Sequence, residues 1–319
     1  MKKLILVCGL LVSLLSCNND SQLEKEIAKI DIDVNVERFD LAFDDAKPSD
    51  LSNLKAAFPF MFSKYENDSI WINRMNDTLQ NQLSAEVRKA FNDFDDIHLE
   101  VRSLFQHLKY YDKSFREPRI ITVTSDVDYR YKTIVTDTIV LLALDTYLGS
   151  NHEFYEGIPK YISQNLNRSQ LVCDLATNYS EQYIHQKSRK TLLDEMIYFG
   201  KQLYFKDVMI PFKTDADKIG YTQQQLDWAA ENESYIWRYF IEKEMLFSTD
   251  NSLPNRFIAL APFSKFYLEL DSESPGRLGQ YIGWQIVRSY MKNNKVPLMD
   301  MMQKDAEEIF NNSNFKPSK

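Results

Sequence analysis

The chain has 319 residues, of which 44% are hydrophobic and 13% aromatic. This composition excludes a disordered or low-complexity protein, because a chain of this length and character can bury a large core. Its formal net charge of −8 is also unfavourable for a nucleic-acid-binding protein, since the phosphates of nucleic acids are bound by basic surfaces.

The N-terminus has the pattern of a bacterial lipoprotein signal. Two lysines precede an apolar run over residues 4–15, and the run ends in Leu14-Leu15-Ser16-Cys17. We expect cleavage before Cys17 and acylation (palmitate among the acyl groups) of this residue. The alternative is an ordinary secretory signal with an incidental cysteine. The apolar run is too short to span a bilayer comfortably, so the anchor is expected to be lipid.

This interpretation divides the chain into three parts. Residues 1–16 are the signal peptide, residues 17–30 a lipidated tether, and residues 31–319 a single domain. Loss of the two signal lysines leaves the mature chain with a net charge of −10. We therefore expect contact with the membrane through the lipid, and no contact with nucleic acid.

The first half of the domain is predicted to contain the strands. Apolar and polar residues alternate over 32–36, which predicts a short strand with one solvated face. A β-branched run at 119–124 and a nearly continuous apolar run at 138–144 predict two more. Between the strand at 32–36 and the strand at 119–124 we expect a helix near 48–57 and two or three amphipathic helices over 68–111.

The second half is predicted to be helical after a loop at 145–161. The expected helices are 167–185, 189–205, 222–247, 274–291 and 298–311. Glycines on one face of the 274–291 helix should let a neighbouring helix approach closely. The predicted fold class is therefore α+β, predominantly helical with a small mixed sheet.

The segment from Leu192 to Phe205 is predicted to be a central, buried helix, because its apolar residues recur at helical spacing. It contains Asp194, Glu195 and Tyr198 in the order D-E-x-x-Y. A zinc peptidase carries H-E-x-x-H in such a helix, with two histidine ligands four residues apart and a glutamate base. Both histidines are missing here, so tight zinc binding is not expected.

Glu233 falls on the expected apolar stripe of the 222–247 helix, and a buried carboxylate needs a partner. It is either a degenerate third metal ligand or, as we favour, paired with Lys201, Lys265 or Arg277. An alternative enzyme would use Glu195 as a base with Asp194 and Glu233 as oxygen ligands for Ca²⁺, Mg²⁺ or Mn²⁺.

The remaining chemistry-bearing residues give weaker signals. His98 and His107 are nine residues apart, which is not a ligand spacing on one helical face. His152 and Glu153 are adjacent in an expected loop, where a polar pair is only a minor possibility. Cys173 lies in an apolar segment and is interpreted as a small core residue.

Several segments together resemble the GldB family of gliding motility lipoproteins of the Bacteroidetes. The resemblance extends from Val36-Glu37-Arg38-Phe39-Asp40 to Phe315-Lys316-Pro317. The motifs that carry it are Phe199-Gly200-Lys201-Gln202-Leu203-Tyr204-Phe205, Gly220-Tyr221-Thr222, Glu233-Ser234-Tyr235-Ile236-Trp237-Arg238-Tyr239-Phe240, Ala261-Pro262-Phe263-Ser264-Lys265-Phe266, Ser274-Pro275-Gly276-Arg277 and Gly283-Trp284-Gln285-Ile286-Val287.

The resemblance implies a lipoprotein of the cell envelope that is needed for gliding, with its body facing the periplasm and protein partners in the motility machinery. It implies no established enzymatic activity. The family is in turn distantly similar to predicted H-E-x-x-H zinc peptidases, which implies a degenerate zincin-like architecture and a pseudo-peptidase. Asp194, Glu195, Tyr198 and Glu233 would then be vestigial metal-site positions.

We therefore predict a non-catalytic interaction protein that has no cofactor and no small-molecule substrate. From their helical positions, five residues are predicted to line its interaction cleft: Tyr198, Lys201, Trp237, Arg277 and Tyr281.

Overall fold

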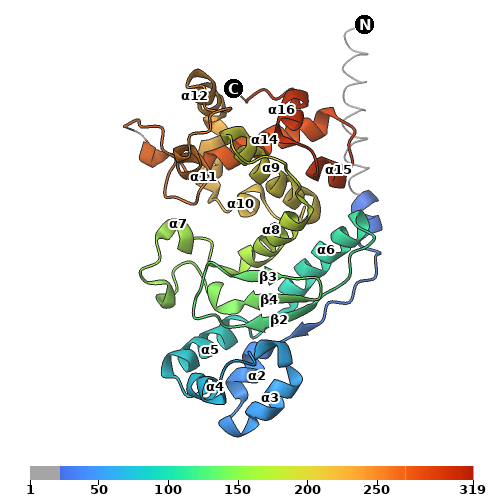
Figure 1. Cartoon of the computed structure of the whole chain (residues 1–319), viewed down its shortest axis with the longest axis vertical. Helices are drawn as coiled ribbons and strands as arrows, with labels where there is room; N and C mark the ends of the chain where they lie inside the picture. The colour runs from blue at the N-terminus through green and yellow to red at the C-terminus, as the bar shows by residue number, and fades with distance from the viewer. Residues whose placement is uncertain (1–21, 270, 319) are drawn as a thin grey trace, which may run out of the picture.

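The computed structural model describes residues 22–269 and 271–318. The expected signal peptide and Cys17 lie outside the described residues. As predicted, the described chain is mostly helical with one small mixed sheet. The sheet lies near the middle of the view in Figure 1, with the first helices below it and the C-terminal helices above. No helix in the described part of the chain is long and apolar enough to cross a bilayer.

The sheet contains four strands in the order β1-β2-β4-β3. β1 (Val36–Glu37) and β4 (Ile139–Ala143) both pair in parallel with β2 (Arg119–Val123), and β3 (Thr133–Val135) pairs antiparallel with β4. The predicted strands at 119–124 and 138–144 are thus confirmed. β4 is a nearly continuous apolar run because it is a central strand covered on both faces.

Two differences from the predicted strands have simple causes. Ile32 and Val34 are buried while Asp31 and Asp33 are exposed, so the predicted alternation is present. Only the end of this extended segment finds a strand partner, which leaves β1 with two residues. β3 was not predicted, since three residues are too few for a recognisable alternation.

Five helices separate β1 from β2 along the chain: α2 (Phe39–Asp45), α3 (Leu51–Ala57), α4 (Asp68–Met75), α5 (Thr78–Ala90) and α6 (Asp95–Tyr111). The helices predicted near 48–57 and over 68–111 are confirmed. Phe39, Phe43 and Phe62 form a small aromatic core against one face of the sheet, together with Ile121 of β2. On the other face, Ile120 and Val140 join a much larger core.

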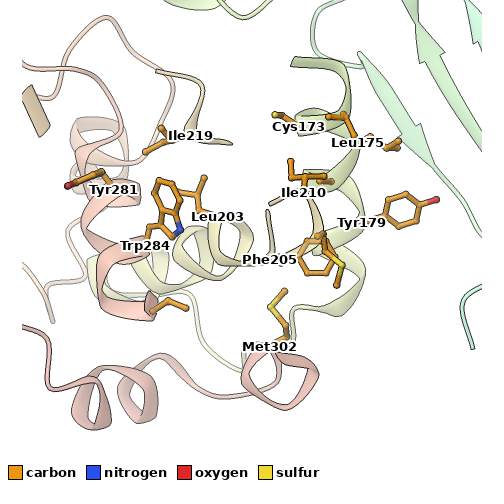
Figure 2. Packing of buried hydrophobic residues seen from close by; sticks show 14 of the residues in the cluster. Cys173, Leu175, Tyr179, Leu203, Phe205, Ile210, Ile219, Tyr281, Trp284 and Met302 are labelled. Atoms are coloured by element: carbon orange, nitrogen blue, oxygen red, sulfur yellow. The ribbon is translucent and has the colours of Figure 1, made fainter. Parts of the chain in front are cut away.

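The larger core joins α6 and the sheet to most of the C-terminal helices. The C-terminal helices are α7 (Lys160–Ser163), α8 (Leu171–Tyr183), α9 (Leu192–Met209), α10 (Asp215–Ile219), α11 (Gln223–Glu231), α12 (Glu233–Glu242), α13 (Ser252–Phe257), α14 (Leu278–Asn293), α15 (Leu298–Met302) and α16 (Ala306–Ser313). In Figure 2, Leu203 of α9 points towards Trp284 of α14, and Phe205 points towards α8. The predicted central helix is confirmed, because α9 packs against both neighbours.

α9 and α14 cross at two glycines. A Cβ atom on Gly283 would lie 1.8 Å from the carbonyl oxygen of Met196, and one on Gly200 would lie 2.4 Å from the carbonyl oxygen of Gly283. Contacts this short are impossible for a real side chain, so the crossing requires glycine at both positions. The prediction that glycines of this segment admit a neighbouring helix is confirmed.

Three predicted helices have different boundaries. The capping box at Thr222 is present, with Gln225 as its partner. The expected long helix is interrupted at Asn232, whose side chain donates to the carbonyl of Trp228, and continues as α12 to Glu242. The expected helix at 274–291 begins only at Leu278, because Arg277 has a left-handed backbone with φ of 62°. The expected helix at 298–311 is divided into α15 and α16.

Candidate functional site

A large cavity with a partly polar lining lies along one face of α9. Its volume is about 520 Å³. Glu195, Phe199, Gln202, Leu203 and Lys206 line it, at offsets of 0, 4, 7, 8 and 11, which place them on one helical stripe. The other walls come from α8, from the segment before β3, from the end of α10 and the residue after it, and from the segment that leads into α14. Parts of the chain that are distant in sequence therefore supply its walls.

The predicted D-E-x-x-Y sequence is out of phase with this stripe by one residue. Asp194 caps the start of its own helix: its backbone N–H donates to Thr191 Oγ1 over 3.1 Å, and its carboxylate accepts the backbone N–H groups of Lys190 and Thr191 over 2.9 and 3.0 Å. This is a capping box, and it occupies the side chain that would have to be a metal ligand.

Glu195 and Tyr198 both contact Arg189. Arg189 Nε donates to the Glu195 carboxylate over 2.9 Å, and its guanidinium lies 3.7 Å from the centroid of the Tyr198 ring. The guanidinium is thus held by an ion pair on one side and a cation–π contact on the other. In this arrangement Glu195 and Tyr198 hold the segment before α9 onto the helix.

Glu233 is buried on α12 and is 5% exposed. Its carboxylate accepts the hydroxyl of Tyr281 over 3.1 Å and the backbone N–H of Ser318 over 2.9 Å. The predicted pairing with Lys201, Lys265 or Arg277 is therefore wrong. A hydroxyl and a terminal backbone amide supply the hydrogen bonds that were expected from a cation.

The three carboxylates of the alternative enzyme do not converge. Asp194 binds its own N-terminal turn, Glu195 binds Arg189, and Glu233 binds α14 and the C-terminus. Within residues 22–269 and 271–318, no group of three or more His, Cys, Asp or Glu side chains is arranged to hold a metal ion.

The five residues of the predicted interaction cleft are also dispersed. Arg277 lines the cavity, but Lys201 is fully buried and Tyr281 is 4% exposed, so neither is accessible to a partner. Trp237 packs against Phe310 and Phe315, and Tyr198 lies under Arg189. The prediction of one cleft is corrected because only Arg277 lines the cavity, while Lys201 and Tyr281 are buried within the core and Tyr198 and Trp237 pack against other side chains.

Lys201 is a buried cation held by carbonyl groups. Its Nζ donates to the carbonyl of Met302 over 3.3 Å and also to that of Lys304. Burial lowers the pKa of Lys201 from 10.5 to about 8, although the charges of Asp305 and Glu308 oppose the shift. The side chain thus ties α9 to the end of α15.

This depressed pKa predicts a pH dependence of stability. The unfolded chain binds more protons than the native chain between the two pKa values, so native stability rises with pH in that interval. We expect the free energy of unfolding of the wild type, relative to Lys201→Met, to increase by about 2 kcal/mol from pH 7 to pH 10. Urea unfolding at a series of pH values measures this. A difference that stays flat over the interval would contradict the assignment.

Four cations line the cavity, and two of them have carboxylate partners. Lys132 pairs with Asp174 over 2.5 Å, and Asp174 also accepts the hydroxyl of Tyr147 over 2.9 Å. Lys218 pairs with Asp207 over 3.0 Å. The charges of Lys132 and Lys218 are therefore balanced by their carboxylate partners.

The other two cations are Lys206 and Arg277, and each donates a hydrogen bond to a backbone carbonyl group. Lys206 Nζ donates to the carbonyl of Lys218 over 2.8 Å, and Arg277 Nη2 to that of Gly220 over 2.9 Å. Desolvation is the main cause that lowers the pKa of both groups, and the charge of Asp174 opposes this shift in both. For Lys206 the neighbouring charges of Arg277 and Lys132 add to the lowering. The cavity wall, which also contains the carboxylates of Asp174 and Glu195, thus carries two cations that form no ion pair within the described residues.

Arg277 is held in place by contacts between distant segments. Its guanidinium lies 5.3 Å from the centroid of the Tyr221 ring, and the Tyr221 hydroxyl donates to the carbonyl of Gly276. A Cβ atom on Gly276 would lie 2.2 Å from the carbonyl oxygen of Ala261. The left-handed backbone of Arg277 is an outlier of the kind that clusters at binding sites.

The sequence indicated Arg277 but missed Lys132, Asp174 and Lys206. A usable signal existed for Lys206, because it is a charged residue that continues the stripe of Glu195 and Phe199 by whole turns of a helix that is otherwise largely buried. No sequence pattern connects Lys132 or Asp174 with α9, since their proximity depends on how the sheet edge and α8 pack.

The residues with weaker signals have ordinary roles. His98 binds the carbonyl of Val34 over 3.1 Å, His107 binds that of Ser103 over 2.8 Å, and His152 contacts Glu86 over 3.3 Å. Cys173 is buried, and burial raises the pKa of its thiol to about 12. A thiol with so high a pKa is a poor nucleophile, in agreement with the predicted core role.

The family model described as "Gliding motility protein GldB" matches residues 20–317. The chain belongs to the GldB family. The family model covers every element of this GldB chain, from β1 to α16, and so confirms the resemblance found in the sequence. No curated protein and no solved structure is significantly similar to the chain.

Membership of the GldB family gives the coarse function. The protein is a lipoprotein related to gliding motility. Its family is a motility component and is not a known enzyme family. The family name also implies a lipid anchor on the cell envelope, as the sequence around Cys17 predicts.

Proposed function

We propose that this GldB-family protein is a non-catalytic, lipid-anchored binding component of the gliding machinery, with its body facing the periplasm. The lipid on Cys17 holds it at the membrane, and residues 31–319 form the body that binds partners. In this proposal the architecture is that of a degenerate zincin-like peptidase, in which the side chains at the former metal-site positions make structural contacts instead.

The observation that carries the proposal is how the D-E-x-x-Y side chains are used. Asp194 caps α9, Glu195 pairs with Arg189, and Tyr198 supports the same guanidinium. Each contact stabilises the junction before α9. A catalytic base must reach a substrate proton, and a carboxylate held by a bidentate ion pair is a weak base for that purpose.

A pair of substitutions tests the proposal. If Glu195 serves only the ion pair, then Glu195→Gln should affect gliding no more than Arg189→Gln, because Arg189→Gln removes the same ion pair and also the cation–π contact with Tyr198. We expect Glu195→Gln to lose about 1 kcal/mol of stability and Arg189→Gln to lose somewhat more, and both variants to restore gliding fully in a host that lacks its own copy. Colony spreading and the movement of single cells are the measurements.

Arg189→Gln is the matched control for expression and folding. Loss of gliding with Glu195→Gln, alongside normal gliding with Arg189→Gln and equal amounts of both proteins in the envelope, would show that the carboxylate has a chemical task. That result would reject the non-catalytic proposal.

A further inference from the structure

Lys206 and Arg277 form an incomplete electrostatic arrangement in the cavity. Lys206 is 8% exposed, and the ammonium group has no carboxylate within ion-pair distance in residues 22–269 and 271–318. Arg277 likewise has no carboxylate partner in this range. Arg277 is half-buried, and the charge of Asp174 in the same wall stabilises both cations in part. Desolvated cations without an ion-pair partner are costly, and the cost falls further when an anion binds between them.

Both groups also keep unused hydrogen-bond donors. An ammonium has three N–H donors and a guanidinium has five, and each of these two groups uses one in the described chain. The carbonyl of Gly220, which accepts a hydrogen bond from Arg277, also accepts hydrogen bonds from the side-chain amides of Gln164 and Asn165 over 3.3 and 3.0 Å. A carbonyl oxygen has only two lone pairs, so it cannot fully satisfy three donors.

We propose that the cavity is a binding site for an organic anion, whose carboxylate or phosphate head group lies between Lys206 and Arg277. The site is a binding site, with no chemical step implied. It stands apart from the proposed function, because such a site can exist whether or not gliding depends on it.

The walls of the cavity indicate what the head group is attached to. Phe199, Leu203 and Ile258 supply apolar surface beside the cations, while Gln202 and Gln280 supply amide groups. A volume of about 520 Å³ is within the range of sites that hold ligands larger than a simple inorganic ion. The expected ligand therefore has an apolar body and one anionic end, such as the C-terminal residue of a peptide.

Calorimetry with the full-length chain in non-ionic detergent tests the site with defined probes. N-acetylphenylalanine presents a carboxylate on an apolar body, phenyl phosphate presents a phosphate, and N-acetylphenylalanine amide is the matched uncharged probe. We expect at least one of the two anions to bind ten-fold or more tightly than the amide. Equal binding of all three, or no binding by either anion, would overturn the proposal.

Lys206→Met should weaken binding of the anion at least ten-fold and leave that of the amide unchanged. Lys201→Met is the matched control, since it also removes a buried cation from α9 but one that lies outside the cavity. If Lys206→Met does not fold, Arg277→Gln gives the same test. Anion binding that survives the loss of either cavity cation, or that is weakened equally by Lys201→Met, would refute the assignment.

Discussion

Replacing Gly283 with alanine should destabilise the protein by about 3 kcal/mol or more. The added Cβ would lie 1.8 Å from the carbonyl oxygen of Met196, so α9 and α14 would have to move apart along their whole contact. Because this contact is part of the large core, the loss of packing would spread beyond the substituted position. Chemical denaturation with circular dichroism measures the change.

The sign of the effect makes this prediction specific. In an exposed helix, glycine to alanine stabilises by about 1 kcal/mol through helix propensity. Gln285→Ala, two residues further along α14, is the matched control and should change stability by well under 1 kcal/mol. A stabilised Gly283→Ala variant would show that the two helices do not cross at this glycine.

Replacing Asp207 with asparagine should cost about 3 kcal/mol of stability. Asp207 binds two cations and an indole: Arg288 Nε over 2.7 Å, Lys218 Nζ over 3.0 Å and Trp284 Nε1 over 2.9 Å. The neutral amide would leave two buried or half-buried cations with less than their full countercharge. It would also present an NH₂ group to donors, which the geometry does not accommodate.

Asp215→Asn is the control for this network. Asp215 also contacts Arg288 and Lys218, over 2.8 and 3.5 Å, but its side chain is 40% exposed. Water can replace part of its interaction, so we expect a loss of no more than about 1 kcal/mol. Equal losses for the two variants in urea unfolding would contradict the central role of Asp207.

The sequence predicted helices well because their signals are local. The apolar spacing of Leu192–Phe205 and the capping box at Thr222 depend on neighbours within a few turns, and both are present. The sequence did not predict where two of these helices are interrupted or begin late, because those points depend on the conformation and contacts of single residues. Asn232 ends a helix by bonding back to Trp228, and Arg277 delays one by adopting a left-handed backbone.

The candidate site was predicted less well, for a related reason. The resemblance to H-E-x-x-H predicted a vestigial metal site at Asp194 and Tyr198. The helical stripe that faces the cavity begins one residue later, at Glu195. A shift of one residue turns a helix by about 100°, which moves every side chain to a different neighbour. Lys206 and Lys132 meet only through tertiary packing, so their shared role was not predictable from spacing.

The most direct test of the central claim is the metal content of the purified protein after dialysis against a mild chelator, combined with thermal melts with and without Zn²⁺ or Mn²⁺. We expect far less than one equivalent of metal and no shift in the melting temperature, since Asp194, Glu195 and Glu233 make separate structural contacts. One retained equivalent that is lost in Glu233→Ala would contradict the account and indicate a metal-dependent enzyme.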